Sequence, residues 1–495
     1  MTTIPVLTIL IFLPLVGALC LSPFIRRDTA ARSVALAIGL LELAIACWTW
    51  TASGTPPPAG APAGFFLFED FSWIESLGAR FTLGMDGISL LMVIMTALLS
   101  IIAMLVSWRS VTERIALHYM LLLVMQSSIM GVFLSLDLFL FYLFWEVMLI
   151  PMFFLIGIWG HGRNIYSATK FFIYTLAGSL LMLLAIIGIY LIHGDQSGVY
   201  TFSLTSLIGT KLNQTIGLWL YAAFLLGFAI KFPLVPFHTW LPDAHTDAPT
   251  AGSVDLAGLL LKTGAYGLIR IGYPLFPEAA RTLTPLLIVL AVTGTIYSAW
   301  IAFAQTDMKR MIAYSSVGHM GFVALGIAAW TPVALTGSIL QMVSHGVTTS
   351  ALFALVGMLA SRAHTMEIRA YGGLWDKVPL LSGFLMLFAM ASAGLPGLNN
   401  FVGEFLILSG SYKVAPTATV LAFLSLILSL IYTVRLLQEL LFQGERQPLQ
   451  MADLTVRELG LLSVLAAGVF YIGLHPAPLL DMLAVPVGIL TGGAP

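Results

Sequence analysis

Long apolar segments follow one another along this chain of 495 residues, with short polar connections between them. An apolar segment of about 20 residues is long enough to cross the hydrocarbon core of a bilayer as a helix. The pattern predicts about fourteen membrane-spanning helices, at residues 4–24, 33–52, 85–107, 115–135, 137–159, 167–192, 215–241, 250–273, 283–304, 309–329, 332–359, 379–411, 416–442 and 456–475. The long polar connection at 51–82 contains the sequence SGTPPPAGAPAG and predicts a loop outside the bilayer. We therefore expect an all-α polytopic membrane protein.

The composition agrees with this class. Hydrophobic residues make up 59% of the chain and charged residues 9%, whereas a soluble domain carries about 25% charged residues. The net charge of −1 indicates no nucleic-acid partner, and the expected surroundings are lipid. Cys20 and Cys47 lie in apolar segments without a CxxC spacing, so they predict neither a disulfide nor a metal site. Because Arg26 and Arg27 follow the first apolar segment and no basic residue precedes it, we interpret that segment as a retained span.

Basic residues in the predicted loops are distributed unevenly between the two sides of the membrane. Fourteen fall on one side: Arg26, Arg27, Arg32, Arg109, Arg114, Arg163, Lys170, Lys309, Arg310, Arg362, Arg369, Lys377, Arg446 and Arg457. Five fall on the other side: Arg80, Lys211, Arg270 at a span end, Arg281 and Lys413. Cytoplasmic loops carry the excess of lysine and arginine. The pattern thus predicts that the side with fourteen basic residues is cytoplasmic. Both termini and the 51–82 loop then lie on the opposite side, which is the periplasm for a bacterial inner membrane.

The three remaining basic residues, Lys231, Lys262 and Arg435, fall inside predicted spans. Lys231 lies near the middle of the seventh span and is followed by Pro233 and Pro236. Each proline removes a backbone donor and clashes with the preceding turn, so we expect this helix to break near Lys231. Free carbonyl groups at membrane depth are tolerated where protein or water satisfies them. The lysine is therefore predicted to face a hydrated interior rather than the membrane interface.

The twelfth span, 379–411, is also interrupted. Gly394, Pro396 and Gly397 break its apolar pattern, and Glu404 follows in the apolar remainder. A pair of broken helices in the two halves of a chain is typical of transporters built from inverted repeats. The charge precedes the prolines in one half and follows them in the other, so the predicted internal repeat is approximate.

Titratable residues occur on six different predicted spans: Glu146, Lys231, Lys262, His319, His345 and Glu404. A single intramembrane histidine is more often a structural core residue, but two lysines and two glutamates beside it favour a proton path. Removal from water disfavours the charged forms of both lysine and glutamate, which makes proton exchange accessible to both. Glu146 is predicted to hold the proton on Lys231 until their separation changes.

Other polar residues have plainer interpretations. His238 and His245 flank Asp243 and resemble a metal site, but their loop setting fixes no ligand geometry, and His238 is a candidate for a cytoplasmic proton entrance instead. The rest are interpreted as structural: Asp86 and Asp137 as caps near span ends, and Arg435 with Glu439 as an ion pair one helical turn apart. No dinucleotide, haem or iron–sulfur spacing occurs, so no cofactor is predicted in this chain.

Four stretches resemble the M-type, antiporter-like subunits of bacterial respiratory complex I and their mitochondrial and photosynthetic counterparts: FYLFWEVMLIPMFFLIGIWG, KFPLVPFHTWLPDAHTDAPTAGSVDLAGLLLKTGAYGLIR, IAYSSVGHMGF and GLPGLNNFVGEFLIL. The resemblance implies two inverted five-helix repeats, with broken helices 7 and 12. The implied segments are 1–110 with spans one to three, 111–280 with the first repeat, 281–445 with the second, and 446–495 with the last span and tail. It also implies proton translocation driven by electron transfer from NADH to quinone elsewhere in the complex.

The same resemblance assigns roles to individual residues. Glu146 and Lys231 match the glutamate of the family's fifth helix and the lysine of its seventh, and Lys262 matches the central lysine. His345 and Glu404 match the histidine of the eleventh helix and the acid of the twelfth. Sibling subunits carry a lysine at that last position, where this chain has Glu404. The L type adds a long lateral helix, for which the short sequence after the last predicted span leaves no room. Both differences favour the M type.

Three functions fit these patterns. The first is a proton-translocating subunit of NADH:quinone oxidoreductase, whose partners would be the L-type and N-type subunits, with FMN, iron–sulfur clusters and quinone in partner subunits. The alternative is a subunit of a multi-subunit cation/proton antiporter, which shares the fold and the lysines without a redox partner. A third, a membrane anchor without transport, does not account for so many titratable groups at membrane depth.

Overall fold

The computed structural model describes residues 4–22, 28–444 and 451–492, and most of them are helical. Eleven helices in these ranges are long and apolar enough to cross a membrane: α2 with η2 (Asp28–Ala52), α3 (Gly87–Ser110), α4 (Ile115–Leu134), α5 with α6 (Leu138–Trp159), α7 (Asn164–Ser197), α9 (Gln214–Lys231), α14 (Pro277–Phe303), α15 (Met308–Ala329), α16 (Pro332–Ala363), α20 with η7 (Pro416–Phe442) and α21 (Val456–Leu474). Shorter apolar helices are α1 (Val6–Cys20), α18 (Pro379–Ser392) and α22 (Ala477–Thr491). The fold is that of a multi-pass helical membrane protein.

Short elements connect or interrupt these helices. They are α8 (Leu204–Leu207), α10 (Trp240–Asp247), α11 (Thr250–Asp255), α12 (Leu261–Gly267), α13 (Tyr273–Leu275), α17 (Leu374–Lys377), α19 (Asn399–Tyr412) and the 3₁₀-helices η3 (Glu75–Leu77) and η6 (Ile368–Ala370). Two π-helical segments, η4 (Leu256–Leu260) and η5 (Leu268–Gly272), enclose α12. A span at 250–273 is therefore not one regular α-helix.

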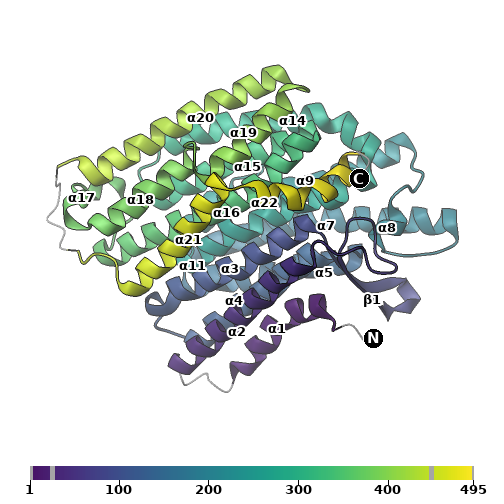
Figure 1. The fold of residues 1–495 in the computed structure, drawn as a ribbon, viewed down its shortest axis with the longest axis horizontal. Coiled ribbons are helices and arrows are strands. Elements are labelled where there is room, and N and C mark those ends of the chain that lie inside the picture. The colour runs from purple at the N-terminus through teal and green to yellow at the C-terminus, as the bar shows by residue number, and fades with distance from the viewer. Residues whose placement is uncertain (1–3, 23–27, 445–450, 493–495) are drawn as a thin grey trace.

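The helices pack side by side, and α16 lies in the middle of the bundle (Figure 1). Nearly all of α16 and α15 is buried, whereas α7, α14 and α20 present large apolar side chains outward, among them Leu184, Trp300 and Phe423. An exposed apolar belt of this kind suits contact with lipid or with neighbouring membrane subunits. The interior of the bundle is where the buried polar groups lie.

Small residues bring α16 and α19 together. A methyl group added at Gly337 would lie 2.6 Å from the backbone nitrogen of Ile407, closer than real contacts allow. Membrane helices use such small residues to let backbones approach each other. The close approach fixes the distance between the polar side chains that these two helices carry.

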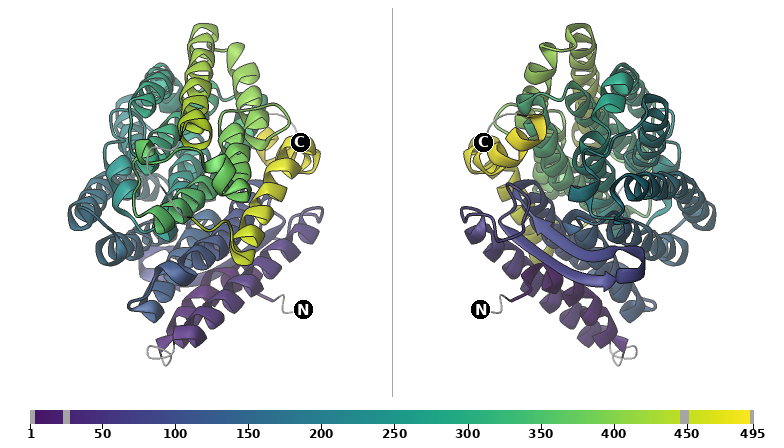
Figure 2. Two further views of the ribbon diagram at one scale, coloured as in Figure 1. Left: turned by 90° about the vertical axis from the view of Figure 1, so that its left-hand side faces the viewer. Right: turned by 90° about the vertical axis from the view of Figure 1, so that its right-hand side faces the viewer.

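Two segments differ from the sequence prediction. Within the expected 51–82 loop, the chain forms an antiparallel hairpin of β1 (Leu67–Ile74) and β2 (Ala79–Met85), which lies across one end of the N-terminal helices (Figure 2). Neither strand alternates between exposed and buried side chains, so the sequence of this segment carries no clear strand pattern. The tail after the last predicted span is helical, as α22. Arg26, Arg27, Arg446 and the end of the 4–24 span lie outside the described residues.

The hairpin is held by polar contacts within itself and with the first helix. Arg80 donates from Nε and Nη2 to the two carboxylate oxygens of Asp70, at 2.8 and 2.7 Å. These hydrogen bonds hold the pKa of Asp70 below its usual value. Glu69 accepts hydrogen bonds from the backbone N–H groups of Leu7 and Thr8, which satisfies free donors at the start of α1. The hairpin therefore anchors the first helix.

Candidate functional site

Four of the titratable residues singled out in the sequence form a contiguous buried row. Lys262 Nζ lies 2.7 Å from His345 Nδ1, and His319 Nδ1 lies 3.1 Å from Glu404 Oε1. The rings of His345 and His319 are 5.3 Å apart between centroids. Each side chain comes from a different helix (α12, α16, α15 and α19), and none is more than 3% exposed. We call Lys262, His345, His319 and Glu404 the central row.

Lys262 is held at the edge of a π-helical segment. Its Nζ donates a hydrogen bond to the carbonyl oxygen of Ala257 in η4 and faces His345 Nδ1 on the other side. An ammonium group donates only, so a charged Lys262 requires that His345 Nδ1 accept and that Nε2 carry the ring proton. His345 Nε2 is buried and has no hydrogen-bond partner within the described ranges. The pair is thus arranged for a proton to move between lysine and imidazole.

Glu404 is enclosed by the turn between α18 and α19. Its Oε1 accepts from Gln341 Nε2 at 3.2 Å as well as facing His319. Gly394 has φ +76°, and a Cβ atom there would lie 2.5 Å from Glu404 Oε2. Glu404 is the sixth residue of α19, beyond the first turn where a carboxylate interacts with a helix dipole. Its partners are therefore His319 of the central row and Gln341 beside it, not the end of its own helix.

Glu146 and Lys231 form a second, looser pair. Lys231 is the last residue of α9 and 1% exposed, and its Nζ has no hydrogen-bond partner among the described residues. The ammonium lies 5.5 Å from the ring centroid of Trp145 and 5.6 Å from that of Phe171, which favours the charge through the faces of the rings. Glu146 interacts with it electrostatically, but no ion pair within 4.0 Å joins them in the part of the chain described.

His238 stands apart from the central row. It is 4% exposed, in the non-helical segment between α9 and α10, with its ring edge-on to Tyr297 at 5.4 Å. His245 instead stacks on Phe353, and Asp243 pairs with Lys170 at 2.7 Å. The three residues that resembled a metal site thus turn to different partners. Among the described residues, no group of three or more His, Cys, Asp or Glu is placed to hold a metal ion.

Arg270 and Asp86 form a buried ion pair that the sequence analysis did not foresee. Their side chains are 7% and 2% exposed and lie 2.5 Å apart. Asp86 also caps α3 by accepting from the backbone N–H of Ser89, as expected, but Arg270 is not a loop cation. Arg270 is buried because Phe65, from the segment before β1, covers it with its ring, whose centroid lies 5.0 Å from the guanidinium carbon.

Two other buried charged residues, Glu42 and Lys309, differ from the sequence prediction. Glu42 in α2 is fully buried, and neither carboxylate oxygen has a partner among the described residues. Lys309 was counted with the loops, yet it is fully buried and donates to the carbonyl of Ala248 at 2.6 Å. The signal for Glu42 was present, since it is the lone charge in an apolar stretch, as Glu146 is. The expected ion pair of Arg435 with Glu439 is confirmed at 2.8 Å.

Comparisons with known proteins identify the family of this chain. The family described as "NADH:quinone oxidoreductase/Mrp antiporter, TM" matches residues 135–431. NADH-quinone oxidoreductase subunit M of Pseudomonas aeruginosa is 44% identical over 96% of this chain and 95% of its own length, and that of Escherichia coli K12 is 41% identical over 97% and 96%.

Solved structures show the same fold. A chain of the structure titled "Respiratory complex I from Thermus thermophilus with bound NADH" has a TM-score of 0.87 at 32% identity, covering 98% of this chain and 100% of that one. A chain of the Mrp complex from Dietzia sp. DQ12-45-1b has a TM-score of 0.87 at 21% identity, covering 99% and 98%, and shows the fold alone. With relatives above 40% identity over nearly their whole length, this chain belongs to the family of NADH-quinone oxidoreductase subunit M.

Proposed function

We propose that this chain is the proton-translocating M-type membrane subunit of an NADH:quinone oxidoreductase, a bacterial respiratory complex I. The observation that carries the proposal is the central row, which joins four titratable groups from four helices in the interior of the bundle. Groups of this kind at membrane depth are costly, and they mark proton relays where they occur together. The chain itself acts without a redox centre, and electron transfer takes place in partner subunits.

The proton passes along the central row from lysine to carboxylate. Lys262 gives a proton to His345 across 2.7 Å, and His319 gives one to Glu404 across 3.1 Å. The step between the two histidines is longer, with 5.3 Å between ring centroids, and requires a water molecule or a ring movement. Glu404 then releases the proton to the outer side past the turn at Gly394.

Glu146 and Lys231 act as the input to this row. The aromatic rings around Lys231 hold its ammonium weakly, so the nearby carboxylate decides whether the lysine keeps its proton. Moving Glu146 away, or protonating it, releases a proton from Lys231 toward Lys262. His238, near the end of α9, supplies protons from the cytoplasmic side.

The architecture proposed with this function has about fourteen spans in two inverted five-helix repeats, residues 111–280 and 281–445, after an N-terminal segment 1–110 and before a last segment 446–495. The end of α9 at Lys231 and the turn between α18 and α19 support broken helices at equivalent places. The L-type and N-type subunits are the membrane partners. Flavin, iron–sulfur clusters and quinone belong to partner subunits, and both termini lie on the periplasmic side of the inner membrane.

Proton uptake by vesicles containing the purified complex tests the proposal. Glu146→Gln, Lys231→Ala and Lys262→Ala are each expected to lower proton uptake per NADH oxidised, while the complex still assembles. Glu439→Gln is the matched control, because its carboxylate belongs to an ion pair outside the path. Normal uptake in all three variants would refute the proposed path.

An antiporter subunit is the second candidate, because the description of the matching family names the Mrp antiporter beside the oxidoreductase. Purification from native membranes separates the two functions. Co-purification of flavin and iron–sulfur subunits supports the oxidoreductase, whereas small multi-span partners alone support the antiporter.

A further inference from the structure

Three arginines meet at one side of the bundle, away from the central row. Arg32 lies in the second turn of α2, Arg109 in the last turn of α3, and Arg457 in the first turn of α21. The start of α21 lies beside the end of α3 (Figure 1). Arg32 Nη2 donates to the carbonyl of Val111, directly after α3, at 3.0 Å. Arg109 and Arg32 both act on Arg457 electrostatically as like charges. We call these residues the arginine cluster.

Two guanidinium N–H groups of the cluster lack acceptors. Arg32 Nε and Arg457 Nη1 are buried, and neither has a hydrogen-bond partner in the part of the chain that the structure describes. A buried N–H group without an acceptor destabilises the fold, and a charged one more so. Since the three charges also repel one another, an anion between them would remove both costs.

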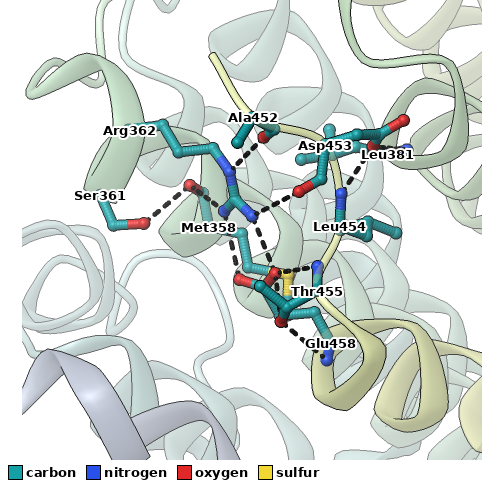
Figure 3. A network of polar contacts seen from close by, with 9 residues as sticks. All are labelled: Met358, Ser361, Arg362, Leu381, Ala452, Asp453, Leu454, Thr455 and Glu458. Atoms are coloured by element: carbon teal, nitrogen blue, oxygen red, sulfur yellow. Dashed lines mark hydrogen bonds and ion pairs between the residues drawn. The ribbon is translucent and has the colours of Figure 1, made fainter.

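Two neighbouring carboxylates, of Glu458 and Asp453, also have other partners. Glu458, directly after Arg457, accepts from Arg362 Nη2 at 2.8 Å and from the backbone N–H of Thr455 at 2.8 Å (Figure 3). The carboxylate of Asp453 accepts from three backbone N–H groups. The charge of Glu458 is thus divided between Arg457 and a fourth arginine, Arg362. The two acids therefore do not neutralise the three arginines, and the arginine cluster keeps a surplus of positive charge.

We propose that the arginine cluster binds the phosphate headgroup of an anionic phospholipid. Phosphate oxygens match the planar fork of guanidinium donors, and basic sites between helix ends at the cytoplasmic surface suit anionic lipids. All three arginines lie on the side predicted to be cytoplasmic. The outward surface of α2 beyond Arg32 is apolar, with Leu40, Leu41 and Trp48 51–59% exposed. Acyl chains can therefore lie along α2, which favours a lipid over a free phosphate ion.

Photolabelling of the purified complex in vesicles tests this site. The probe is phosphatidylglycerol with a photoactivatable acyl chain, and labelling of peptides from α2 and α21 is counted. Arg109→Gln and Arg457→Gln are each expected to lower this labelling about fivefold, the contribution of one arginine near an anionic surface. Arg163→Gln and Arg369→Gln, on the same predicted side, are matched controls and should leave it unchanged. Arg457→Lys keeps the charge and should retain most of the labelling.

Four outcomes would overturn the proposal. Equal labelling in the cluster variants and the controls means that the arginines do not hold the lipid. Equal labelling by a phosphatidylcholine probe means that the headgroup charge is not recognised. Displacement of the probe by millimolar inorganic phosphate means that the site takes a free anion. Loss in Arg457→Lys as large as in Arg457→Gln means that the positive charge at residue 457 does not hold the headgroup.

Discussion

Replacing Glu404 tests whether the central row needs a titratable group at its end or only a partner for its neighbours. In Glu404→Ala, His319 Nδ1 and Gln341 Nε2 both lose their common acceptor, Oε1. Each buried donor left without an acceptor costs about 1–3 kcal/mol, so the fold loses roughly 2–6 kcal/mol in sum. The relay also loses its last proton-accepting group, and proton flux should fall well below the wild-type value.

Glu404→Lys should retain more flux than Glu404→Ala, although it reverses the charge. The introduced ammonium only donates, but both neighbours can adapt to it. His319 can change tautomer so that Nδ1 accepts, and Gln341 can turn its amide by half a rotation. Gln341 Oε1 is buried and has no partner among the described residues, so it is free to accept. A titratable group is then restored at the end of the central row.

The assay is proton flux per NADH oxidised in vesicles, with NADH oxidation alone reporting assembly. We expect the order wild type, then Glu404→Lys, then Glu404→Ala, with Glu439→Ala as a control near wild type. If Glu404→Ala pumps better than Glu404→Lys, the carboxylate is structural and the proposed exit is refuted. A loss of NADH oxidation in parallel with flux would point to failed assembly instead.

Four further predictions follow from packing, charge and topology. Arg270→Met should destabilise the chain by about 3–5 kcal/mol, because it leaves Asp86 buried and unpaired, and adding Asp86→Asn should recover part of this in thermal unfolding of the complex. Gly337→Ala should lower flux by pushing α16 from α19, whereas Gly383→Ala, where a methyl group meets nothing within 4 Å, should not; equal flux would contradict the packing argument. The ionised Asp70, paired with Arg80, stabilises the hairpin fully at pH values above the usual aspartate pKa of about 3.9. The hairpin should therefore lose hydrogen-exchange protection as the pH falls through the lowered pKa of Asp70, and Asp70→Asn should abolish this acid-dependent loss. A cysteine at Ser53 should react with an impermeant label from outside; labelling from the cytoplasm would overturn the topology.

The sequence was sufficient to predict a multi-pass helical membrane protein and to single out several charged residues within its apolar segments. Glu146, Lys231 and Lys262 each stand out because a charge in an apolar segment is costly and requires a partner or a function. The same reasoning applies to Glu42, a lone charge in an apolar stretch, which is fully buried. Local sequence therefore identifies which residues are unusual.

What these residues contact could not be predicted, because the contacts depend on tertiary packing. The Lys262–His345 contact joins residues 83 positions apart and depends on the π-helical segment that places the lysine. Arg270 looks like an interfacial residue in the sequence, and Phe65, from a segment distant in the sequence, covers it. Glu404 could equally have capped its helix, until the fold placed it against His319.

The two π-helical segments that enclose α12 have a mechanical consequence. In an α-helix each residue advances the chain by 100° and 1.5 Å, and a π-helical turn holds an additional residue. Suppose that the additional residue moved from the π-helical turn of η4 to that of η5. The seven-residue α12 would then rotate by about 100° and shift by about 1.5 Å along its axis, while both ends of the span stayed in place. Lys262 would then swing away from His345. A span built in this way can carry its lysine between two directions without any movement of the helices around it.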